Sequence, residues 1–232
     1  MLPGILRFIR KILTGIFLLV FFYQLWILGH VWWWRDHNLH STSFMRLQLR
    51  EMRQQQPDAQ LQQFWVSYND IPIHLKRAVV AAEDDHFMTH NGFDWQGMQS
   101  AIKRNQQSGQ SVRGGSTITQ QLAKNMFLSP SRSYIRKAQE AVITVMLETL
   151  WSKRRILEVY LNVVEWGRGL YGCEAAARHY FTLSATQLGP AEAARMAVML
   201  PNPRVYGENF GPVLQQQAEK IRVRMKVSKV PE

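Results

Sequence analysis

The side chains best suited to acid–base chemistry lie in the segment 81–95 (AAEDDHFMTHNGFDW). An alanine-rich apolar helix runs there into three consecutive acids and then two histidines four positions apart, namely Glu83, Asp84, Asp85, His86 and His90. Acids at the C-terminal end of a helix oppose its dipole and are unfavourable there. This local cost indicates a functional cluster, and a solvated acidic turn is the alternative interpretation.

The two histidines have the spacing of half a zinc site on one helical face. No HExxH arrangement accompanies them, and Cys173 is the only cysteine in the chain. We therefore interpret His86 and His90 as structural side chains beside the acids rather than as metal ligands. Cys173 can form no internal disulfide and is interpreted as a small buried residue.

A second segment, 113–125 (RGGSTITQQLAKN), places a Gly-Gly turn before the start of a predicted helix. Such a turn exposes backbone N–H groups at a helix N-terminus and favours anions. The GxxxxGK[ST] order of a P-loop is absent. The predicted helix start carries the polar side chains Ser116, Thr117, Gln120, Gln121, Lys124 and Asn125.

A third segment, 133–148 (SYIRKAQEAVITVMLE), places Arg136 four residues before Glu140 and Lys137 three residues before it. One helix face therefore offers a carboxylate beside two cations. An ion pair on a solvated face has the same pattern, so the spacing alone does not decide between structure and function.

The elements that must position these side chains are predicted to be helices almost throughout. No run alternates with period two over more than a few residues, so the fold class is mainly α. Residues 36–62 are polar, rich in Gln and Arg and interrupted by Pro57, which predicts a juxtamembrane helix and linker. The predicted helices after it are 75–87, 95–106, 117–125, 134–151, 153–164, 172–181, 185–200 and 213–225.

The N-terminal stretch 12–34 contains no Asp, Glu, Lys or Arg over 23 residues and ends in three tryptophans. As a helix it spans about 34 Å, enough for the hydrocarbon core of a bilayer. A cleaved signal peptide has a shorter apolar region and a small-x-small cleavage site, so a retained anchor is favoured. Basic residues precede the span, whereas Arg35 and Asp36 nearly cancel after it, which predicts a cytoplasmic N-terminus.

The composition adds a constraint on the partner. With 28 Lys and Arg against 17 Asp and Glu, the formal net charge is +11, so the partner is expected to be anionic. Anionic lipid and a phosphorylated substrate fit this charge. Nucleic acid is not predicted as a partner, because the basic residues are spread along the chain and no binding module is visible.

Taken together, these segments resemble the peptidoglycan glycosyltransferase family, whose transglycosylase domain occurs alone or in front of a transpeptidase. The match covers about residues 75 to 206, and the short chain with a single span resembles the monofunctional members. Five segments match the family's blocks in order: 83–94 (EDDHFMTHNGFD), 114–125 (GGSTITQQLAKN), 136–148 (RKAQEAVITVMLE), 153–181 and 192–206.

The resemblance implies a lysozyme-like helical glycosyltransferase domain whose donor is a glycan chain on a lipid pyrophosphate. The acceptor would be the lipid-linked disaccharide pentapeptide, and one displacement would invert the α-linked donor to a β-1,4 bond. Glu83 matches the family's first-block glutamate and is the expected general base. Pyrophosphate leaves as an anion, so cations replace the general acid of glycoside hydrolysis: Lys124, Arg136 and Lys137.

The resemblance also implies roles for the remaining candidates. Glu140, the family's second glutamate, is expected to orient the cations or to help hold a divalent metal, Mg²⁺ or Mn²⁺; no organic cofactor is implied. Substrate contacts are expected from Ser116, Thr117, Gln121 and Asn125, and support around Glu83 from Asp84, Phe87 and His90. Asp85 is assigned no role. The fourth block, with Tyr160, Asn162, Gly167 and Gly172, is expected to serve packing and turns.

These inferences predict a cytoplasmic N-terminus (1–11), a transmembrane helix (12–34), a juxtamembrane helix and linker (35–66) and a glycosyltransferase domain (67–232). The protein would be a single-pass protein of the bacterial cytoplasmic (inner) membrane with its catalytic domain on the outer side. Its expected partners are the lipid-linked precursor, the growing glycan chain, membrane lipids and other cell-wall synthesis proteins. Apolar residues after the anchor, such as Phe44, Met45, Phe64 and Trp65, are expected either in the membrane or in the core.

Two other functions remain open at this point. A muramidase-like lytic transglycosylase would cleave glycan with a single glutamate, but it would not need the cationic third block beside Lys124. A non-catalytic membrane scaffold for cell-wall enzymes would not need Glu83 and Glu140 to be irreplaceable.

Overall fold

The computed structural model describes residues 2–108, 115–131 and 133–232. The chain divides into two compact units, Met1–His37 and Asn38–Glu232, which are described separately. Gly114, the first glycine of the predicted Gly-Gly turn, lies outside the described residues.

The first unit is one helix, α1 (Leu2–Trp34). Its segment Gly4–Trp34 contains an 18-residue stretch with a mean hydropathy of 2.1 and is long and apolar enough to cross a membrane. The helix begins ten residues before the predicted span, so the basic side chains Arg7, Arg10 and Lys11 belong to its first turns. The unit is compatible with a single-pass membrane anchor.

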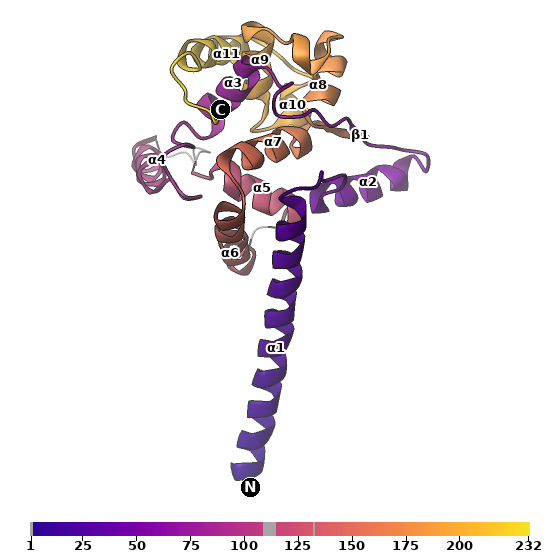
Figure 1. The fold of residues 1–232 in the computed structure, drawn as a ribbon, viewed down its shortest axis with the longest axis vertical. Coiled ribbons are helices and arrows are strands. Elements are labelled where there is room, and N and C mark those ends of the chain that lie inside the picture. Colours follow the sequence, from indigo (N-terminus) through magenta and orange to yellow (C-terminus); the bar gives the residue numbers. More distant parts are fainter. Residues whose placement is uncertain (1, 109–114, 132) are drawn as a thin grey trace. The chain divides into compact units, whose positions relative to one another are not determined.

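The second unit is mainly helical, as predicted (Figure 1). Six of its helices come before the small β2–β3 hairpin: α2 (Ser43–Gln55), α3 (Ile73–Glu83), α4 (Trp95–Ser108), α5 (Ile118–Phe127), α6 (Tyr134–Leu150) and α7 (Lys153–Val163). The others are α8 (Cys173–Phe181), the 3-10 turn η1 (Ala185–Gln187), α9 (Pro190–Met199), α10 (Pro203–Tyr206) and α11 (Pro212–Arg224). α2 lies in this unit and packs against α5.

Serine and threonine caps explain where several helices start. The side chains of Thr42, Thr117, Ser133 and Ser152 each accept a hydrogen bond from the backbone N–H three residues later, at the starts of α2, α5, α6 and α7. Proline occupies the first turn of α9, so the single helix predicted over 185–200 is divided into η1 and α9.

The helix predicted over 75–87 was four residues too long at its C-terminal end. α3 ends at Glu83, because Asp84 leaves the helical region with φ −161° and ψ 71°. His86 and His90 therefore lie in a series of turns rather than on one helical face. The acids do not continue the helix; they begin the loop that enters the site.

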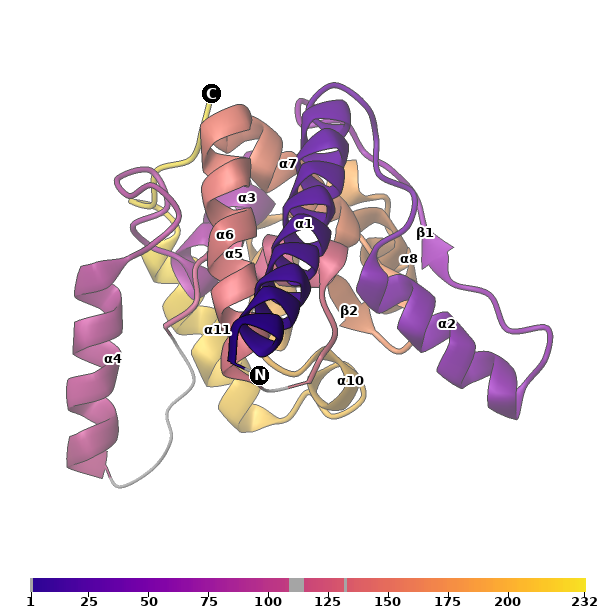
Figure 2. The same ribbon diagram turned by 90° about the horizontal axis from the view of Figure 1, so that it is seen from below.

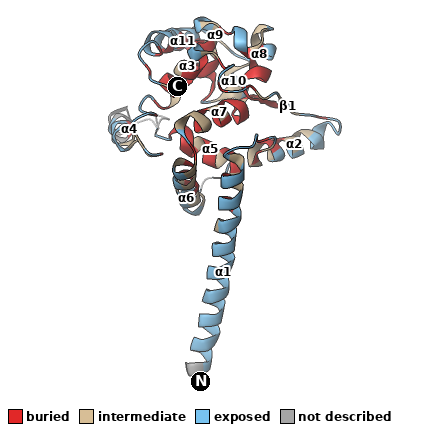
Figure 3. Cartoon of the chain, in the orientation of Figure 1, coloured by how far each residue is buried: buried red, intermediate tan, exposed pale blue. Residues whose placement is uncertain are grey.

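Two groups of helices build the core. α3 packs against α9 and α11, and α5 packs against α6 and α7 (Figures 1 and 2). α9 presents Ala193, Ala194 and Ala197 to the core, and small side chains of this kind allow two helix backbones to approach closely. Buried residues concentrate in α3, α5, α7, α8 and α9 (Figure 3). Cys173 is fully buried and burial raises its thiol pKa to about 12, which confirms the structural interpretation.

A small sheet that the sequence pattern did not predict joins distant parts of the second unit. β1 (Gln62–Gln63) pairs in parallel with β3 (Leu170–Tyr171), and β2 (Glu165–Gly167) pairs antiparallel with β3. Strands of two or three residues are too short to show an alternating pattern. Asn162 lies beside this sheet, and its side-chain amide bonds both the N–H and the carbonyl of Val66, at 2.8 and 2.9 Å.

Gly172 is expected to be one of the least replaceable glycines. Its φ is +80°, and an added Cβ would lie 2.7 Å from the carbonyl oxygen of Asn162. Gly172→Ala should therefore destabilise the protein by about 2–4 kcal/mol, a fall in melting temperature of roughly 5–15 °C. Thermal unfolding of the full chain in detergent, followed by circular dichroism, measures this effect.

Gly211 provides the matched control, since it is also the glycine cap of a helix, α11. Its φ is −89°, and an added Cβ would meet no described atom within 4 Å. Gly211→Ala should cost less than about 1 kcal/mol. Equal losses of stability in the two variants would show that neither the positive φ of Gly172 nor its contact with Asn162 causes the destabilisation.

Candidate active site

Glu83 lies at the last residue of α3, where its carboxylate receives a hydrogen bond from α5. The Gln121 Nε2–H donates to Glu83 Oε2 over 2.6 Å. Burial raises the pKa of Glu83, and the neighbouring charge of Asp84 adds to the rise, while the Gln121 bond and the charge of Lys124 oppose it. A carboxyl group with a raised pKa is suited to accept a proton, because its conjugate base is stronger than an ordinary carboxylate.

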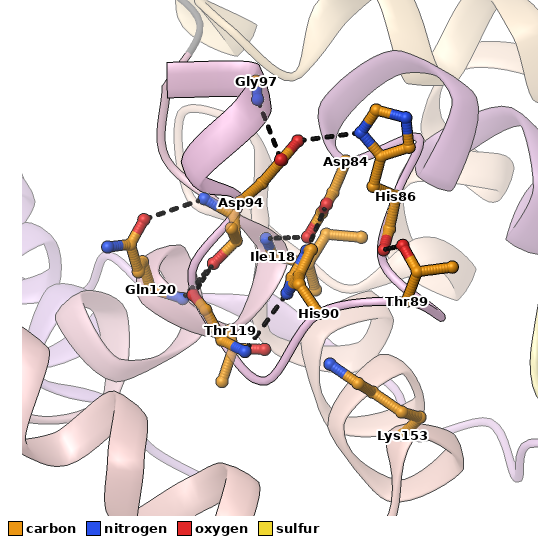
Figure 4. Close-up of polar contacts among 12 residues, drawn as sticks. Asp84, His86, Thr89, His90, Asp94, Gly97, Ile118, Thr119, Gln120 and Lys153 are labelled. Atoms are coloured by element: carbon orange, nitrogen blue, oxygen red, sulfur yellow. Dashed lines mark hydrogen bonds and ion pairs between the residues drawn. The ribbon is translucent and has the colours of Figure 1, made fainter. Parts of the chain in front are cut away.

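Asp84 fixes the loop that follows Glu83 (Figure 4). Its Oδ2 accepts from the backbone N–H of Ile118 at 3.0 Å, and its Oδ1 lies 2.7 Å from His90 Nε2. The Gly92 N–H donates to His90 Nδ1, so the His90 proton is on Nε2 and points at Asp84. Asp84 and His90 thereby hold the first-block loop against the N-terminus of α5.

This arrangement changes the interpretation of the helix N-terminus at Thr117. We predicted a start that attracts an external anion, yet the carboxylate of Asp84 occupies the first N–H of the helix. Thr117 is buried; its Oγ1 accepts from the Gln120 N–H and donates to the Gly92 carbonyl at 2.7 Å. Its predicted contact with substrate stays a prediction.

The first histidine of this block, His86, has a different partner. His86 Nδ1 lies 3.0 Å from Asp94 Oδ2, and Asp94 Oδ1 accepts from the Gly97 N–H at 2.8 Å (Figure 4). The hydrogen bond to Asp94 raises the pKa of His86. Phe87 between them in sequence is fully buried, with Lys153 Nζ 4.5 Å from its ring centre. The two histidines thus bind different carboxylates.

Glu140 forms the ion pairs that its spacing predicted. Its Oε2 accepts from Arg136 Nη1 at 2.7 Å, and its Oε1 accepts from the Lys137 ammonium. The carboxylate is 3% exposed, whereas Lys137 is 48% exposed. The Nε of Arg136 is also buried, with no hydrogen-bond partner among the described residues. One buried carboxylate therefore neutralises part of the charge of two cations.

Lys124 links this ion-pair cluster to Glu83. Burial lowers the pKa of Lys124 and the positive charges of Arg136 and Lys137 lower it further, while Glu140 and Glu83 oppose them. Its ammonium lies 5.5 Å from the ring centre of Phe44. In the described part of the chain it has no ion-pair partner within 4 Å. A half-buried, unpaired ammonium is suited to bind a phosphate oxygen.

Two cavities meet at Glu83. The first, of about 720 Å³, is lined by Glu83, Ser116, Gln121 and Lys124, by the α2 side chains Phe44, Leu47, Gln48 and Glu51, and by Glu165 and the segment 200–204. The second, of about 500 Å³, is lined by Glu83 and Ser116 with Asp84, Asp85, His86, Asp94, Met98, Thr117 and Arg224. Glu83 and Ser116 therefore separate two spaces that can each receive a ligand.

Several contributors to the first cavity were not predicted from sequence. Gln48 was not singled out and Phe44 was expected only in the membrane or in the core, although Phe44, Leu47, Gln48 and Glu51 follow the spacing of one helix face. Met45 is buried, so for this residue the core alternative holds, whereas Phe44 is half-buried and lines the cavity. Arg136, Lys137, Glu140 and Asn125 do not line either cavity.

The residues at Glu140 do not fit a divalent metal. Both carboxylate oxygens already bind cations, and no cluster of three His, Cys, Asp or Glu side chains able to hold a metal occurs among the described residues. Magnesium prefers several oxygen ligands in an octahedral arrangement. The geometry agrees with the other role predicted for Glu140, which is to orient the cations, and no chemical step is derived through a metal.

Comparison of the sequence with known proteins identifies a matching family and several similar proteins. The family model described as Transglycosylase matches residues 49–228. A biosynthetic peptidoglycan transglycosylase of Azoarcus sp. (strain BH72) is 62% identical over 97% of both chains. Similar proteins of the same name from Aromatoleum aromaticum and Dechloromonas aromatica are 61% and 54% identical, over 97% of this chain and 98% of theirs.

Proposed function

The chain belongs to the transglycosylase family and is a peptidoglycan glycosyltransferase of cell-wall synthesis, and from this premise we propose that it polymerises a lipid-linked disaccharide pentapeptide into β-1,4 glycan strands. In this proposal, the acceptor 4-hydroxyl attacks the anomeric carbon of a growing chain on a polyprenyl pyrophosphate. The bond from that carbon to the pyrophosphate breaks, with inversion, and Glu83 takes the hydroxyl proton.

The observation that carries the proposal is the position of Glu83 between two cavities. A transferase must hold a donor and an acceptor at once, and the base must reach the hydroxyl of the acceptor. Glu83 lines both spaces, and its raised pKa suits it to take the proton. Lys124 lines only the first cavity, so we assign the pyrophosphate donor to that cavity and the acceptor to the second.

The leaving group explains why one carboxylate is sufficient. Pyrophosphate departs as an anion and needs neutralisation by positive charge rather than protonation. Lys124 supplies an ammonium in the donor cavity, and Arg136 and Lys137 add positive charge that Lys124 senses. Glu140 keeps these two cations together. Cleavage of a sugar–sugar bond would have no use for this cluster, which favours synthesis over a lytic reaction.

The membrane anchor fits a substrate with a polyprenyl tail. Both the enzyme and its substrate would be confined to the bilayer, which raises the local substrate concentration. The basic residues before the apolar segment of α1 support an N-terminus in the cytoplasm and a catalytic unit on the outer side of the inner membrane. Anionic lipids and other cell-wall synthesis proteins complete the proposed set of partners.

The proposed reaction is tested with purified full-length protein, lipid-linked disaccharide pentapeptide and detergent. We expect long glycan strands and one equivalent of released polyprenyl pyrophosphate for each disaccharide added. Preformed glycan strands, incubated in parallel, should keep their length. Shortening of those strands would support the lytic alternative, and substrate binding without any product would support the scaffold alternative.

A further inference from the structure

Tyr160 on α7 is connected to Glu83 by two hydrogen bonds in series. Its hydroxyl donates to Gln121 Oε1 over 3.0 Å, and Gln121 Nε2 donates to Glu83 Oε2 over 2.6 Å. The three side chains come from α7, α5 and α3, so elements far apart in sequence meet in one line. Tyr160 is fully buried and lines neither cavity, so it does not reach a substrate directly.

Both bonds point in the same direction, toward the carboxylate. An amide offers an oxygen at one end and an N–H at the other, so a donor on the oxygen side leaves the N–H side for Glu83. Hydrogen bonds in such a chain polarise one another, and a donor facing a carboxylate favours its ionised form. The chain therefore supports Glu83 in the form that can accept a proton.

The Tyr160 hydroxyl stays protonated, as this series of hydrogen bonds requires. Burial raises the pKa of Tyr160 well above its ordinary value, and the nearby charges of Glu83 and Asp84 raise it further. The phenol thus remains protonated and able to donate. The sequence predicts a packing role for Tyr160, and its fully buried ring agrees with this prediction, but packing alone does not require the hydroxyl.

We propose that Tyr160 is a positioning residue that acts on Glu83 through Gln121, by holding the Gln121 amide with its Nε2 toward the Glu83 carboxylate. The proposal rests on the proposed role of Glu83 as the base. Without the hydroxyl, Gln121 Oε1 loses its donor and the amide loses the polarisation that strengthens its bond to Glu83. Glu83 then holds a proton at a higher pH, and less of the enzyme is competent at acid pH.

The first test is Tyr160→Phe, which keeps the ring and removes only the hydroxyl. The polymerisation rate should fall about three- to tenfold at the acid end of the pH profile. At the plateau above this acid limb, where Glu83 is ionised in both proteins, the rate should stay within about twofold of native. A loss that is equal at every pH would mean that the hydroxyl matters only for structure and would overturn the proposal.

Tyr68→Phe is the matched control, because Tyr68 is also buried and its hydroxyl also donates a hydrogen bond, to the Pro231 carbonyl at 2.6 Å. It tests the loss of a buried tyrosine hydroxyl outside the two cavities. The acid limb of the Tyr68→Phe profile should match that of the native protein. If the acid limb of this control moved to higher pH, the effect would not be specific to Tyr160, and the proposed hydrogen-bond series would be contradicted.

Gln121→Leu tests the connection from its middle residue. This variant alone should displace the acid limb in the same direction as Tyr160→Phe. Adding Tyr160→Phe to Gln121→Leu should then cause no further displacement, because both substitutions interrupt the same chain. Additive displacements would show that Tyr160 acts on Glu83 by another route and would overturn the proposal.

A direct titration separates this proposal from the proposed catalytic role. Full-length protein in detergent, labelled with ¹³C at the glutamate Cδ, reports the protonation of Glu83 without substrate; Glu83→Gln identifies its signal. The pKa of Glu83 should be higher in Tyr160→Phe than in native protein and in Tyr68→Phe, and an unchanged value would overturn the proposal. If the value rises but Glu83→Gln still polymerises at the native rate, the hydrogen-bond chain stands and the role of Glu83 as base fails.

Discussion

Glu83→Gln is expected to lower the polymerisation rate by about 10²- to 10⁴-fold, the range that a general base contributes. The amide has almost the same shape as the carboxylate and can still accept the Gln121 hydrogen bond, but it cannot take a proton from the acceptor hydroxyl. Substrate binding should therefore persist within a few-fold of native. Single-turnover polymerisation and binding of the lipid-linked precursor, measured on the same preparations, separate the two effects.

Glu219→Gln is a suitable control for the Glu83 variant. Glu219 is an exposed carboxylate on α11 whose hydrogen bonds go to Arg222, and it lines neither of the two cavities at Glu83. Its replacement should leave the rate within about twofold, since exposed ion pairs contribute little. A native rate in Glu83→Gln would remove Glu83 as the base, whereas equal losses of rate and substrate binding would make it a binding residue.

Glu140→Gln is expected to have the second largest effect, because it removes the one carboxylate that, among the described residues, pairs with both Arg136 and Lys137. Removing one partner of a buried ion pair leaves an uncompensated charge and destabilises by roughly 3–5 kcal/mol. Lys137 is half exposed and can regain water, so we expect a loss of about 2–4 kcal/mol. Glu219→Gln, which breaks an exposed pair, should cost less than about 1 kcal/mol.

The same variant should alter the enzyme through Lys124. Glu140 opposes the lowering of the Lys124 pKa, so its loss lowers that pKa further and the ammonium gives up its proton at a lower pH. The alkaline limb of the rate profile should move to lower pH, and the rate at neutral pH should fall about 10²-fold as leaving-group stabilisation is lost. Measurements below the melting temperature of the variant exclude unfolding as the cause. A requirement for more Mg²⁺, with an unmoved alkaline limb, would instead support a metal-binding role for Glu140.

The sequence was most informative where a local pattern carried the interaction. The spacing of Arg136, Lys137 and Glu140 predicted an ion-pair face, and the structure has both pairs. Gly172 was expected at a turn, and its positive φ confirms this. Capping serines and threonines lie at the starts of several helices, so most predicted helix starts were correct within two residues.

What could not be predicted depends on contacts between distant segments. The end of α3 at Glu83 follows from Asp84, whose carboxylate binds Ile118 34 residues later. The hydrogen bond from Tyr160 to Gln121 joins α7 to α5, and no residue spacing within either helix predicts it. Likewise, a juxtamembrane helix was predicted where α2 lies, but its packing against α5, which makes one of its faces a wall of the donor cavity, was not.

The most direct test of the central claim is a pair of single-turnover pH–rate profiles, for the native protein and for Glu83→Gln. The native rate should rise with pH through a limb set by the raised pKa of Glu83 and then reach a plateau. The residual rate of Glu83→Gln should lack this limb, since the group that titrates is gone. The same limb in both proteins would contradict the account, because another group would then be the base.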